Sequence, residues 1–428
     1  MHAAAVSTPA RTISGVRVHG FRSIVDLTME LGPLCALVGA AQSGKSNLLA
    51  ALDVLLDARA PVVETDAPAQ VEEPLAITAT LASGERVALD ARGRTGFAPP
   101  SLFLPAGERA ARLVAREPEE GVAAHALDLF RQALAEQTGV SGPSAALPAA
   151  SLVDGLEACC VEGVSGLVLL IEEPELYLRP QAQRYLYRLL RTFAQGGNQV
   201  LYSTHSANLL NVARLDEIVF VERPGGATRA RRAQALAVDA DFRLLTEFDA
   251  ARSELLLARA ALLVEGQTER LALPFAFAAK GFDADRENVA IVECGGKGNL
   301  PLFARVCRAA GVPYVVLHDR DRDEPLNREI RALAGDAHTF VLSPDFERAA
   351  GLGRGRHKPE RAWRRFADMS GESLPRPVAD AIERVVELAR GGAPTIASPA
   401  LRRAPFCGWQ RRRAGGHSSQ VIREGGIP

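Results

Sequence analysis

Lysine is almost missing from this chain of 428 residues, which has four lysines among its 50 basic side chains. Arginine therefore carries nearly all the positive charge. Where lysine persists, a compact ammonium group is a candidate requirement, because guanidinium would serve wherever charge alone matters. Lys45, Lys297 and Lys358 lie in or near the motifs described below, whereas Lys280 does not.

Long apolar runs and patterned cysteines are also missing. No stretch of eighteen apolar residues occurs, which predicts that the chain has no membrane-spanning helix. Residues 1–7 lack the apolar core of a signal peptide. The six cysteines have no metal-ligand spacing, so we expect reduced thiols and a cytoplasmic protein.

The net charge of −1 does not by itself indicate a nucleic-acid partner. Residues 351–428 nevertheless hold 15 basic and 7 acidic side chains. This excess could attract a phosphate backbone, or it could be an ordinary solvated surface. Residues 395–428 have no apolar periodicity, so a disordered basic tail is expected, with out-of-frame translation of GC-rich DNA as the alternative.

The periodicity of apolar residues predicts two α/β units. In the first, residues 12–223, we expect strands within 14–37, a helix at 47–56, a hairpin at 75–90 and a helical insertion at about 107–160. Buried strands should follow at 167–171, 198–203 and 217–221, then a linker at 224–256. In the second, residues 257–365, strands 261–265, 289–293, 314–318 and 338–342 alternate with helices, and residues 366–428 form a C-terminal helix and tail.

Residues 39–46, GAAQSGKS, form a complete G-x-x-x-x-G-K-S phosphate-binding loop between a predicted strand and a predicted helix. In such a loop, backbone N–H groups converge on phosphate, the lysine reaches the β- and γ-phosphates, and the serine hydroxyl ligates Mg²⁺. The predicted ATP-binding residues here are Gly39, Gln42, Ser43, Gly44, Lys45, Ser46 and Asn47, with Ser46 also a Mg²⁺ ligand.

Two further motifs supply the partners that this loop needs. Glu172 and Glu173 follow a buried strand, so we assign Glu172 to Mg²⁺ and Glu173 to activation of the attacking water. His205 follows the next buried strand and is positioned to sense the γ-phosphate. A charged cap at a strand end and an isolated structural histidine are the alternative readings.

A second acidic pattern lies downstream. Glu265 ends an apolar strand, and Glu269 is one helical turn further on. Asp319 and Asp321 are alternate residues after strand 314–318, so their side chains share a face if the strand continues. Carboxylates that converge from separate strand ends form a site for Mg²⁺ or Mn²⁺, and a pair of such ions can promote phosphodiester cleavage. Solvated loop ends are the alternative.

The motifs of the first unit, with Phe21-Arg22-Ser23-Ile24 upstream, resemble the ABC-type ATPases of the SMC/RecF class. Such proteins bind ATP between two heads, and each head receives a signature loop from its partner. No clear signature occurs; residues 151–155, SLVDG, are the best-placed candidate. Only 127 positions separate Lys45 from Glu172, which leaves no room for a long coiled-coil arm.

The second unit resembles the Toprim domain, whose hallmark is a glutamate on one strand and a later D-x-D. An ABC-type ATPase followed by a Rossmann-like Toprim domain is similar to the OLD (overcoming lysogenization defect) family over residues 12–365. The resemblance implies metal ligation by Glu265, Glu269, Asp319 and Asp321, with Asp323 as an outer ligand and Glu347 as a candidate. It implies catalytic roles for Glu173, Glu265, Asp319 and Asp321. It also puts Lys297 near the scissile phosphate and Lys358 where it could stabilise the transition state, although a plain surface role for Lys297, Glu347 and Lys358 stays open.

The sequence thus predicts an ATP-hydrolysing, divalent-metal-dependent DNA endonuclease, dimeric or of higher order, for phage defence or DNA repair and with a helicase-like partner. The alternative is an ATP-gated DNA clamp or recombination mediator whose Toprim unit does not cut. The intact acids argue against it. A topoisomerase would need a tyrosine nucleophile, and three of the five tyrosines, Tyr177, Tyr185 and Tyr187, lie in or beside the ATPase helix.

Overall fold

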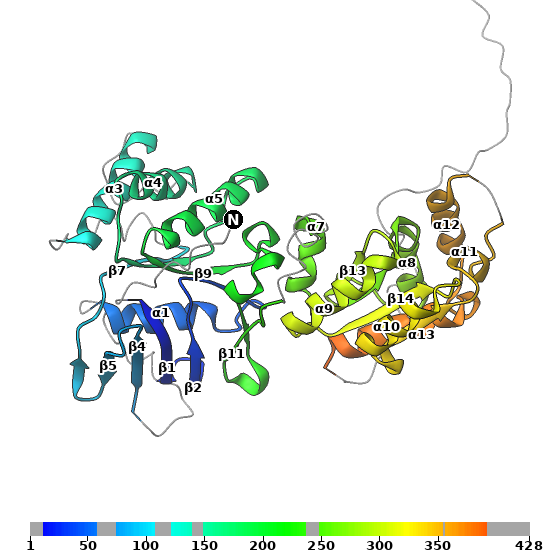
Figure 1. Cartoon of the computed structure of the whole chain (residues 1–428), viewed down its shortest axis with the longest axis horizontal. Helices are drawn as coiled ribbons and strands as arrows, with labels where there is room; N and C mark the ends of the chain where they lie inside the picture. The colour runs from blue at the N-terminus through cyan, green and yellow to red at the C-terminus, as the bar shows by residue number, and fades with distance from the viewer. Residues whose placement is uncertain are drawn as a thin grey trace, which may run out of the picture.

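The computed structural model describes residues 12–57, 74–107, 121–138, 149–236, 248–353 and 356–391. Two α/β units follow one another along the chain, the first to the left in Figure 1 and the second to the right. The basic tail and parts of the predicted insertion and linker lie outside the described residues. Among the described residues, no helix is both long enough and apolar enough to cross a membrane.

A six-stranded sheet forms the centre of the first unit. Its strands are parallel except β11, which runs antiparallel at one edge. Alternate residues of β3 face two different apolar cores, which is why this strand reads as a continuous apolar run. In order across the sheet, the strands are β11 (Arg229–Arg232), β10 (Ile218–Glu222), β3 (Leu34–Val38), β9 (Gln199–Thr204), β8 (Val168–Glu172) and β7 (Ser101–Leu104).

An antiparallel sheet and three helices cover the two faces of this central sheet. Helix α1 (Lys45–Leu56) lies between the two sheets and buries its leucines in their shared core. Helices α3 (Val122–Thr138), α4 (Ala149–Val161) and α5 (Pro180–Gln195) pack on the other face. The antiparallel strands, in order, are β2 (Ile24–Glu30), β1 (Ile13–Phe21), β4 (Ala76–Leu81), β5 (Arg86–Asp90) and β6 (Gly93–Thr95).

Strand β11 falls inside the range 224–256 that we predicted as a linker, and it pairs with β10 of the first unit. The chain then reaches α7 (Ala250–Ser253) and the 3-10 helix η6 (Glu254–Leu257). The Arg231 guanidinium donates to Ala310 O at 2.7 Å, and Gln234 N donates to Ala309 O at 3.0 Å. The two units are therefore joined by direct contacts as well as by the chain.

A four-stranded, fully parallel sheet forms the second unit, and its strands begin and end within one residue of the predicted positions. Helices α9 and α10 pack on one face, and α8, α12 and α13 on the other. Across the sheet, the strands are β13 (Val289–Glu293), β12 (Ala260–Val264), β14 (Tyr314–Asp319) and β15 (Thr339–Leu342). The helices are α8 (Gln267–Ala279), α9 (Leu300–Ala310), α10 (Glu324–Ala334), α11 (Phe346–Ala349), α12 (Lys358–Ala367) and α13 (Arg376–Ala389).

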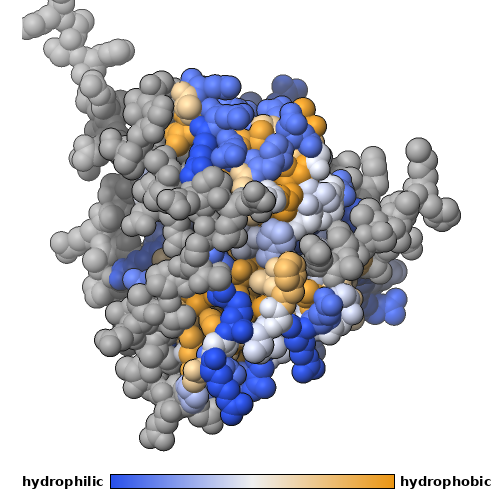
Figure 2. Space-filling model, turned by 90° about the vertical axis from the view of Figure 1, so that its left-hand side faces the viewer, coloured by the Kyte–Doolittle hydropathy of each residue, from blue (hydrophilic) through white to orange (hydrophobic). Residues whose placement is uncertain are grey.

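Figure 2 looks at the molecule from the outer end of the first unit. On this face, hydrophilic residues are interspersed with small groups of apolar ones. Scattered apolar residues of this kind are normal on a protein surface.

Candidate functional sites

Three motifs of the first unit meet at one edge of its central sheet. Strands β3, β9 and β8 are parallel neighbours, so their carboxyl ends lie side by side. The phosphate-binding loop follows β3, Glu172 ends β8, and His205 follows β9. In open α/β sheets, ligands bind at this edge.

The two glycines of the loop are required by close approach and by backbone conformation. A Cβ on Gly39 would lie 2.0 Å from Val221 O on the neighbouring strand. Gly44 has a φ of +107°, and a Cβ there would lie 2.2 Å from the Thr228 hydroxyl. The loop is therefore packed tightly against β10 and against the segment that precedes β11.

Lys45 begins α1 and is 5% exposed. Its Nζ donates to the Gly39 and Ala40 carbonyls at 2.8 and 2.9 Å, which holds the ammonium inside the loop. Burial lowers the pKa of Lys45, while the Glu173 and Glu175 carboxylates oppose that shift. The buried Ser43 hydroxyl has no hydrogen-bond partner among the described residues, so the cradle retains an unused polar group. These features fit a bound phosphate.

A chain of side-chain hydrogen bonds supports the loop from behind. Asn47 Nδ2 donates to Ser23 Oγ at 2.6 Å, and Ser23 Oγ lies 2.7 Å from Thr228 Oγ1. The Thr228 hydroxyl also donates to Ser43 O at 3.1 Å. The sequence pointed to Ser23 and Asn47 but not to Thr228, which lies in the predicted linker and has no motif of its own.

The acidic motif and the histidine face each other across β8 and β9. His205 Nε2 is 3.9 Å from Glu173 Oε1, and both side chains are partly exposed. Glu175, to which the sequence assigned no role, accepts hydrogen bonds from the Thr204 hydroxyl at 2.9 Å and from His205 N at 2.6 Å. Glu172 accepts from Ala106 N at 3.0 Å. Glu175 thus fixes the backbone that presents His205.

The candidate signature segment, residues 151–155, lies within helix α4. Ser151 is fully buried, and a Cβ on Gly155 would lie 2.3 Å from the Phe130 ring of α3. Because Ser151 faces the core of its own unit, it is not available to a nucleotide on a second chain. This expectation is therefore corrected.

Glu265 and Asp319 meet where the parallel strands β12 and β14 end. Glu265 Oε1 accepts a hydrogen bond from Asp319 N at 2.7 Å. The Asp319 side chain in turn accepts from Phe346 N at 2.7 Å, the first residue of α11. One acid thus orients the next, and the ends of β12 and β14 are connected to the start of α11.

Burial and mutual repulsion raise the pKa values of the acids here. Burial is the main cause for Asp319, whose pKa rises to about 7 with a further contribution from Glu265. Glu269 is 7% exposed, and burial with repulsion from Asp319 and Glu265 raises its pKa to about 7 as well. The pKa of Glu265 is also raised, mainly by burial. The raised pKa values mean that the ionised form of these acids is unfavourable in the folded chain without a bound cation.

Lys297 lies behind the D-x-D segment and is 8% exposed. Its Nζ donates to Asp319 O at 2.6 Å and to Asp321 Oδ1 at 2.7 Å. Burial alone would raise the pKa of Asp321, but hydrogen bonding and positive charge, chiefly from the Lys297 ammonium, outweigh burial, so the pKa is lowered overall. The same Asp321 oxygen accepts from Asp323 N at 3.1 Å, and Asp323 caps α10 through Leu326 N. Lys297 and Asp321 therefore hold this segment in place.

Glu347 and Lys358 form an ion pair at the start of α11 and α12. Lys358 Nζ lies 2.7 Å from Glu347 Oε1, and this hydrogen bond raises the pKa of Lys358. The charges of Glu347 and Asp345 contribute to the raised pKa of Asp319, so both lie near the cluster. Asp345, to which the sequence assigned no role, caps α11 through Arg348 N at 2.7 Å.

The donor set fits a hard divalent cation in chemistry. Glu265, Glu269 and Asp319 supply carboxylate oxygens, the ligands that Mg²⁺ and Mn²⁺ prefer. Within the described residues, no three acidic, histidine or cysteine side chains already converge on one point as a preformed cage. The uncompensated charge of these acids is the observation that favours a cation.

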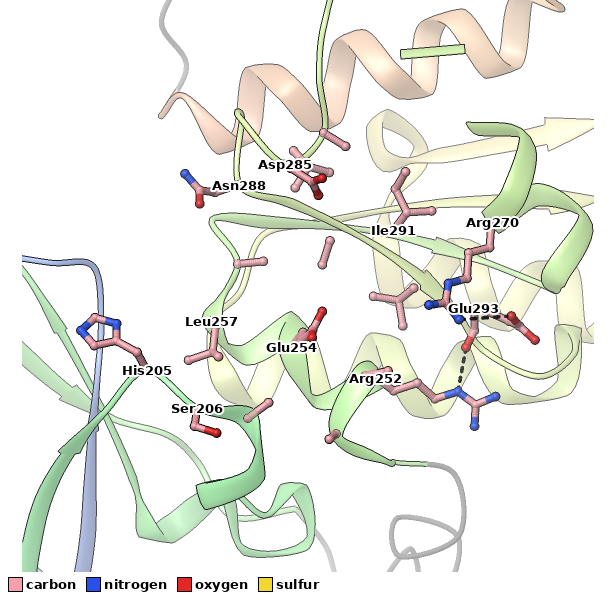
Figure 3. A pocket seen from close by; sticks show the side chains of 18 of the residues that line it. His205, Ser206, Arg252, Glu254, Leu257, Arg270, Asp285, Asn288, Ile291 and Glu293 are labelled. Carbon is pink, nitrogen blue, oxygen red and sulfur yellow. Dashed lines mark hydrogen bonds and ion pairs between the residues drawn. The ribbon is translucent and has the colours of Figure 1, made fainter. Parts of the chain in front are cut away.

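A groove of about 1010 Å³ lies between the two units (Figure 3). His205 and Ser206 border it from the first unit, and the 3-10 helix that follows them, η2 (Ala207–Leu209), contacts α7 and η6. Arg252 of α7 donates to Glu293 O at 2.9 Å. Glu293 ends β13, just before the loop that carries Lys297. The groove wall thus connects the histidine loop to the acidic site.

Three family models match parts of the chain. "Overcoming lysogenization defect protein-like, TOPRIM domain" matches residues 256–321, and "AAA domain, putative AbiEii toxin, Type IV TA system" matches residues 150–211. "Protein of unknown function (DUF2813)" matches residues 12–66. These matches fall on the two units that carry the sites.

Among curated proteins, the chain is 37% identical to the OLD nuclease of Thermus scotoductus over 215 residues, 44% of this chain and 41% of that protein. It is 32% identical to the Old nuclease of Escherichia phage P2 over 165 residues, 37% of this chain and 28% of that protein. It is also 32% identical to the nickel import ATP-binding protein NikO of Rhodobacter capsulatus over 266 residues, 56% of this chain and 98% of that protein. The matches to the two OLD nucleases thus span less than half of their length.

The two sheets, their motifs and these matches define an ABC-type P-loop ATPase unit followed by a Toprim unit. The predicted fold class is confirmed. Within that class, the chain is similar to the OLD nucleases, and its Toprim unit matches the OLD-like Toprim family model.

Proposed function

We propose that this protein is an ATP-hydrolysing, divalent-metal-dependent DNA endonuclease. The observation that carries the proposal is the set of buried carboxyls at the ends of β12 and β14. Burial, together with repulsion from neighbouring carboxylates, raises the pKa values of Asp319 and Glu269 to about 7. Keeping such acids buried costs stability, which a site that binds cations recovers on binding.

Glu265, Glu269 and Asp319 would hold the metal, with Glu347 able to join them. Two bound Mg²⁺ or Mn²⁺ ions supply charge stabilisation for the attacking and leaving oxygens of a phosphodiester. Glu265 positions Asp319 by accepting its backbone N–H at 2.7 Å. Lys297 holds the backbone of Asp319 and the carboxylate of Asp321. Lys358, paired with Glu347, is the cation that can turn toward a phosphate at this site.

ATP would bind in the first unit, at the carboxyl ends of β3, β8 and β9. Lys45 would contact its phosphates, and Ser46 and Glu172 would hold its Mg²⁺. Glu173 would act on the attacking water. Its Oε1 lies 3.9 Å from His205 Nε2. Contacts run from the histidine loop through η2 and α7 to Glu293 O. We infer that nucleotide state reaches the Toprim site along this route and controls cutting, in a dimer that closes around ATP.

The names of the related OLD nucleases support cutting, and the sequence hypothesis of phage defence with a helicase-like partner remains part of the proposal. The decisive experiment incubates the full chain with supercoiled plasmid and Mg²⁺ or Mn²⁺, with and without ATP. We expect nicked or linear plasmid with metal and none with a chelator. Plasmid that binds but stays supercoiled in every condition would refute cutting and favour the clamp.

A further inference from the structure

A second polar cavity, of about 380 Å³, lies on the α10 side of the Toprim sheet, next to the ends of β14 and β15. Three arginines line it, Arg320, Arg328 and Arg331, together with one acid, Glu324. We call it the arginine cavity. In a chain of net charge −1, three guanidinium groups against one carboxylate are a local excess of positive charge.

The arginine cavity and the acid cluster lie on opposite sides of one short segment. His318 and Arg320 line the cavity, whereas Asp319 and Asp321 do not. Extended backbone directs alternate side chains to opposite faces, which explains the division between His318 and Asp319 at the end of β14. The cavity is therefore one residue away from the acids along the chain and is held in fixed relation to them.

Two buried groups show that the cavity is polar at its base. His318 is 1% exposed, and its Nδ1 lies 2.8 Å from Asp319 O, while its Nε2 has no partner among the described residues. Asn327 Nδ2 donates to Arg320 O at 2.8 Å, and its buried Oδ1 likewise has no partner. Unsatisfied buried polar groups cost stability, so a polar, hydrated ligand fits here and an apolar one does not.

Arg320 and Arg331 are available for such a ligand, and Arg328 is held by a long hydrogen bond from its Nε to Glu324 O at 3.4 Å. Within the described part of the chain, no hydrogen bond or ion pair holds the Arg320 guanidinium, and the partner of Arg331, Asp336, is an exposed carboxylate 3.3 Å away. Exposed ion pairs of this kind contribute little stability and exchange readily. Guanidinium groups match the oxygens of phosphate in geometry and charge.

We propose that the arginine cavity is a phosphate-binding subsite that holds the nucleic-acid strand beside the acid cluster. This inference rests on the proposed function. The acids repel the backbone of an approaching strand, and the cavity supplies compensating attraction one residue away. Arg320 anchors the phosphate nearest the acids, and Arg328 and Arg331 on α10 hold the strand further along.

The test measures binding of a fluorescent oligonucleotide to the full chain as a function of salt, with Ca²⁺ in place of Mg²⁺ to suppress cutting. The double variant Arg328→Gln/Arg331→Gln should reduce the slope of log affinity against log salt by about 2. The matched control is Arg305→Gln/Arg376→Gln, two exposed Toprim arginines outside the cavity, which should keep the wild-type slope. Equal slopes for both double variants would overturn the subsite.

Oligonucleotides with and without a 5′-phosphate identify the source of the phosphate. Because we propose contact with the strand itself, the loss of slope should appear with both. A loss confined to the 5′-phosphorylated oligonucleotide would overturn the strand assignment and indicate a terminal phosphate. Wild-type protein that binds DNA with the expected slope but never cuts would sink the nuclease proposal and leave the subsite standing.

Discussion

The two sites differ in how their polar groups are balanced. At the phosphate-binding loop, Lys45 is satisfied by two loop carbonyls, and Ser23, Asn47 and Thr228 bond to one another. At the Toprim edge, the half-buried Asp319 and the buried Glu269 both have raised pKa values. Among the described residues, the loop leaves the uncharged Ser43 hydroxyl without a partner, whereas the Toprim edge retains a charge imbalance that a cation would correct. Bound nucleotide should therefore change the reaction rates more than the thermal stability of the protein. Bound metal should change both.

The largest effect that this comparison predicts is on cutting. Asp319→Ala removes the acid that links the ends of β12 and β14, so the metals lose a shared ligand. We expect plasmid cutting to fall at least about 1000-fold, the equivalent of several kcal/mol of charge stabilisation. Rates of plasmid nicking measure it, with Asp380→Ala on α13, whose side chain is about half exposed, as the control. Undiminished cutting by Asp319→Ala would remove Asp319 from the site.

The second effect separates the sites. Lys45→Ala removes the ammonium that the loop holds, so ATP turnover should fall by about 100-fold or more. The Toprim acids are untouched, so the variant should still bind metal with wild-type affinity. Phosphate release and a metal titration check the two parts. Wild-type turnover would refute the nucleotide assignment, and lost metal binding would mean that the sites are not separable.

The third effect concerns stability and pH. Glu269 has a higher pKa in the folded chain, about 7, than when unfolded, so the folded state binds the extra proton. Its contribution to stability is present below about pH 4.5 and is lost as the pH rises to about 7. In metal-free protein at pH 8, Glu269→Gln should therefore be more stable than wild type by about 2 kcal/mol, or roughly 4 °C in Tm.

Two controls accompany that experiment: the same Tm comparison at a lower pH, and the same comparison with added metal. At pH 5 the difference in Tm between Glu269→Gln and wild type should shrink, because both side chains are then neutral. Added Mg²⁺ should raise the Tm of wild type more than that of the variant. A difference that does not change with pH would show that Glu269 titrates normally.

The smallest predicted effect concerns the hydrogen bonds that support the phosphate-binding loop. Thr228→Val removes the hydroxyl that bonds Ser23 and Ser43 O, at a cost of about 1 kcal/mol, or about fivefold in the KM for ATP. Thr228→Ser keeps the hydroxyl and should behave as wild type. ATPase kinetics at several ATP concentrations decide between them. If Thr228→Val and Thr228→Ser have the same KM for ATP, the hydrogen bonds of Thr228 do not support the loop.

The scarcity of lysine gains meaning from these contacts. Lys45 and Lys297 are both nearly buried, and each Nζ donates to two backbone carbonyls. Three donors on a compact ammonium suit such sites, and a planar guanidinium would not fit the same space. Lys358 differs, because its side chain is largely exposed and pairs with one carboxylate.

The strands that carry the motifs, and the sheet edge at which each motif lies, could be predicted from the amino-acid sequence alone. Local apolar periodicity sets the elements, and parallel pairing brings the ends of β3, β8 and β9 together. The same reasoning placed Glu265 and Asp319 at the ends of separate strands, and the structure makes those strands neighbours. These predictions depend on short-range patterns, which a sequence displays directly.

Contacts between residues far apart in the chain became known only from the folded structure. Thr228 bonds to Ser43 across 185 positions, and Glu265 accepts from Asp319 N across 54. No periodicity encodes such contacts, because they depend on how sheets and loops pack. The raised pKa values of Asp319 and Glu269 and the pairing of Lys297 with Asp321 have the same origin, since burial and distance exist only in the folded chain.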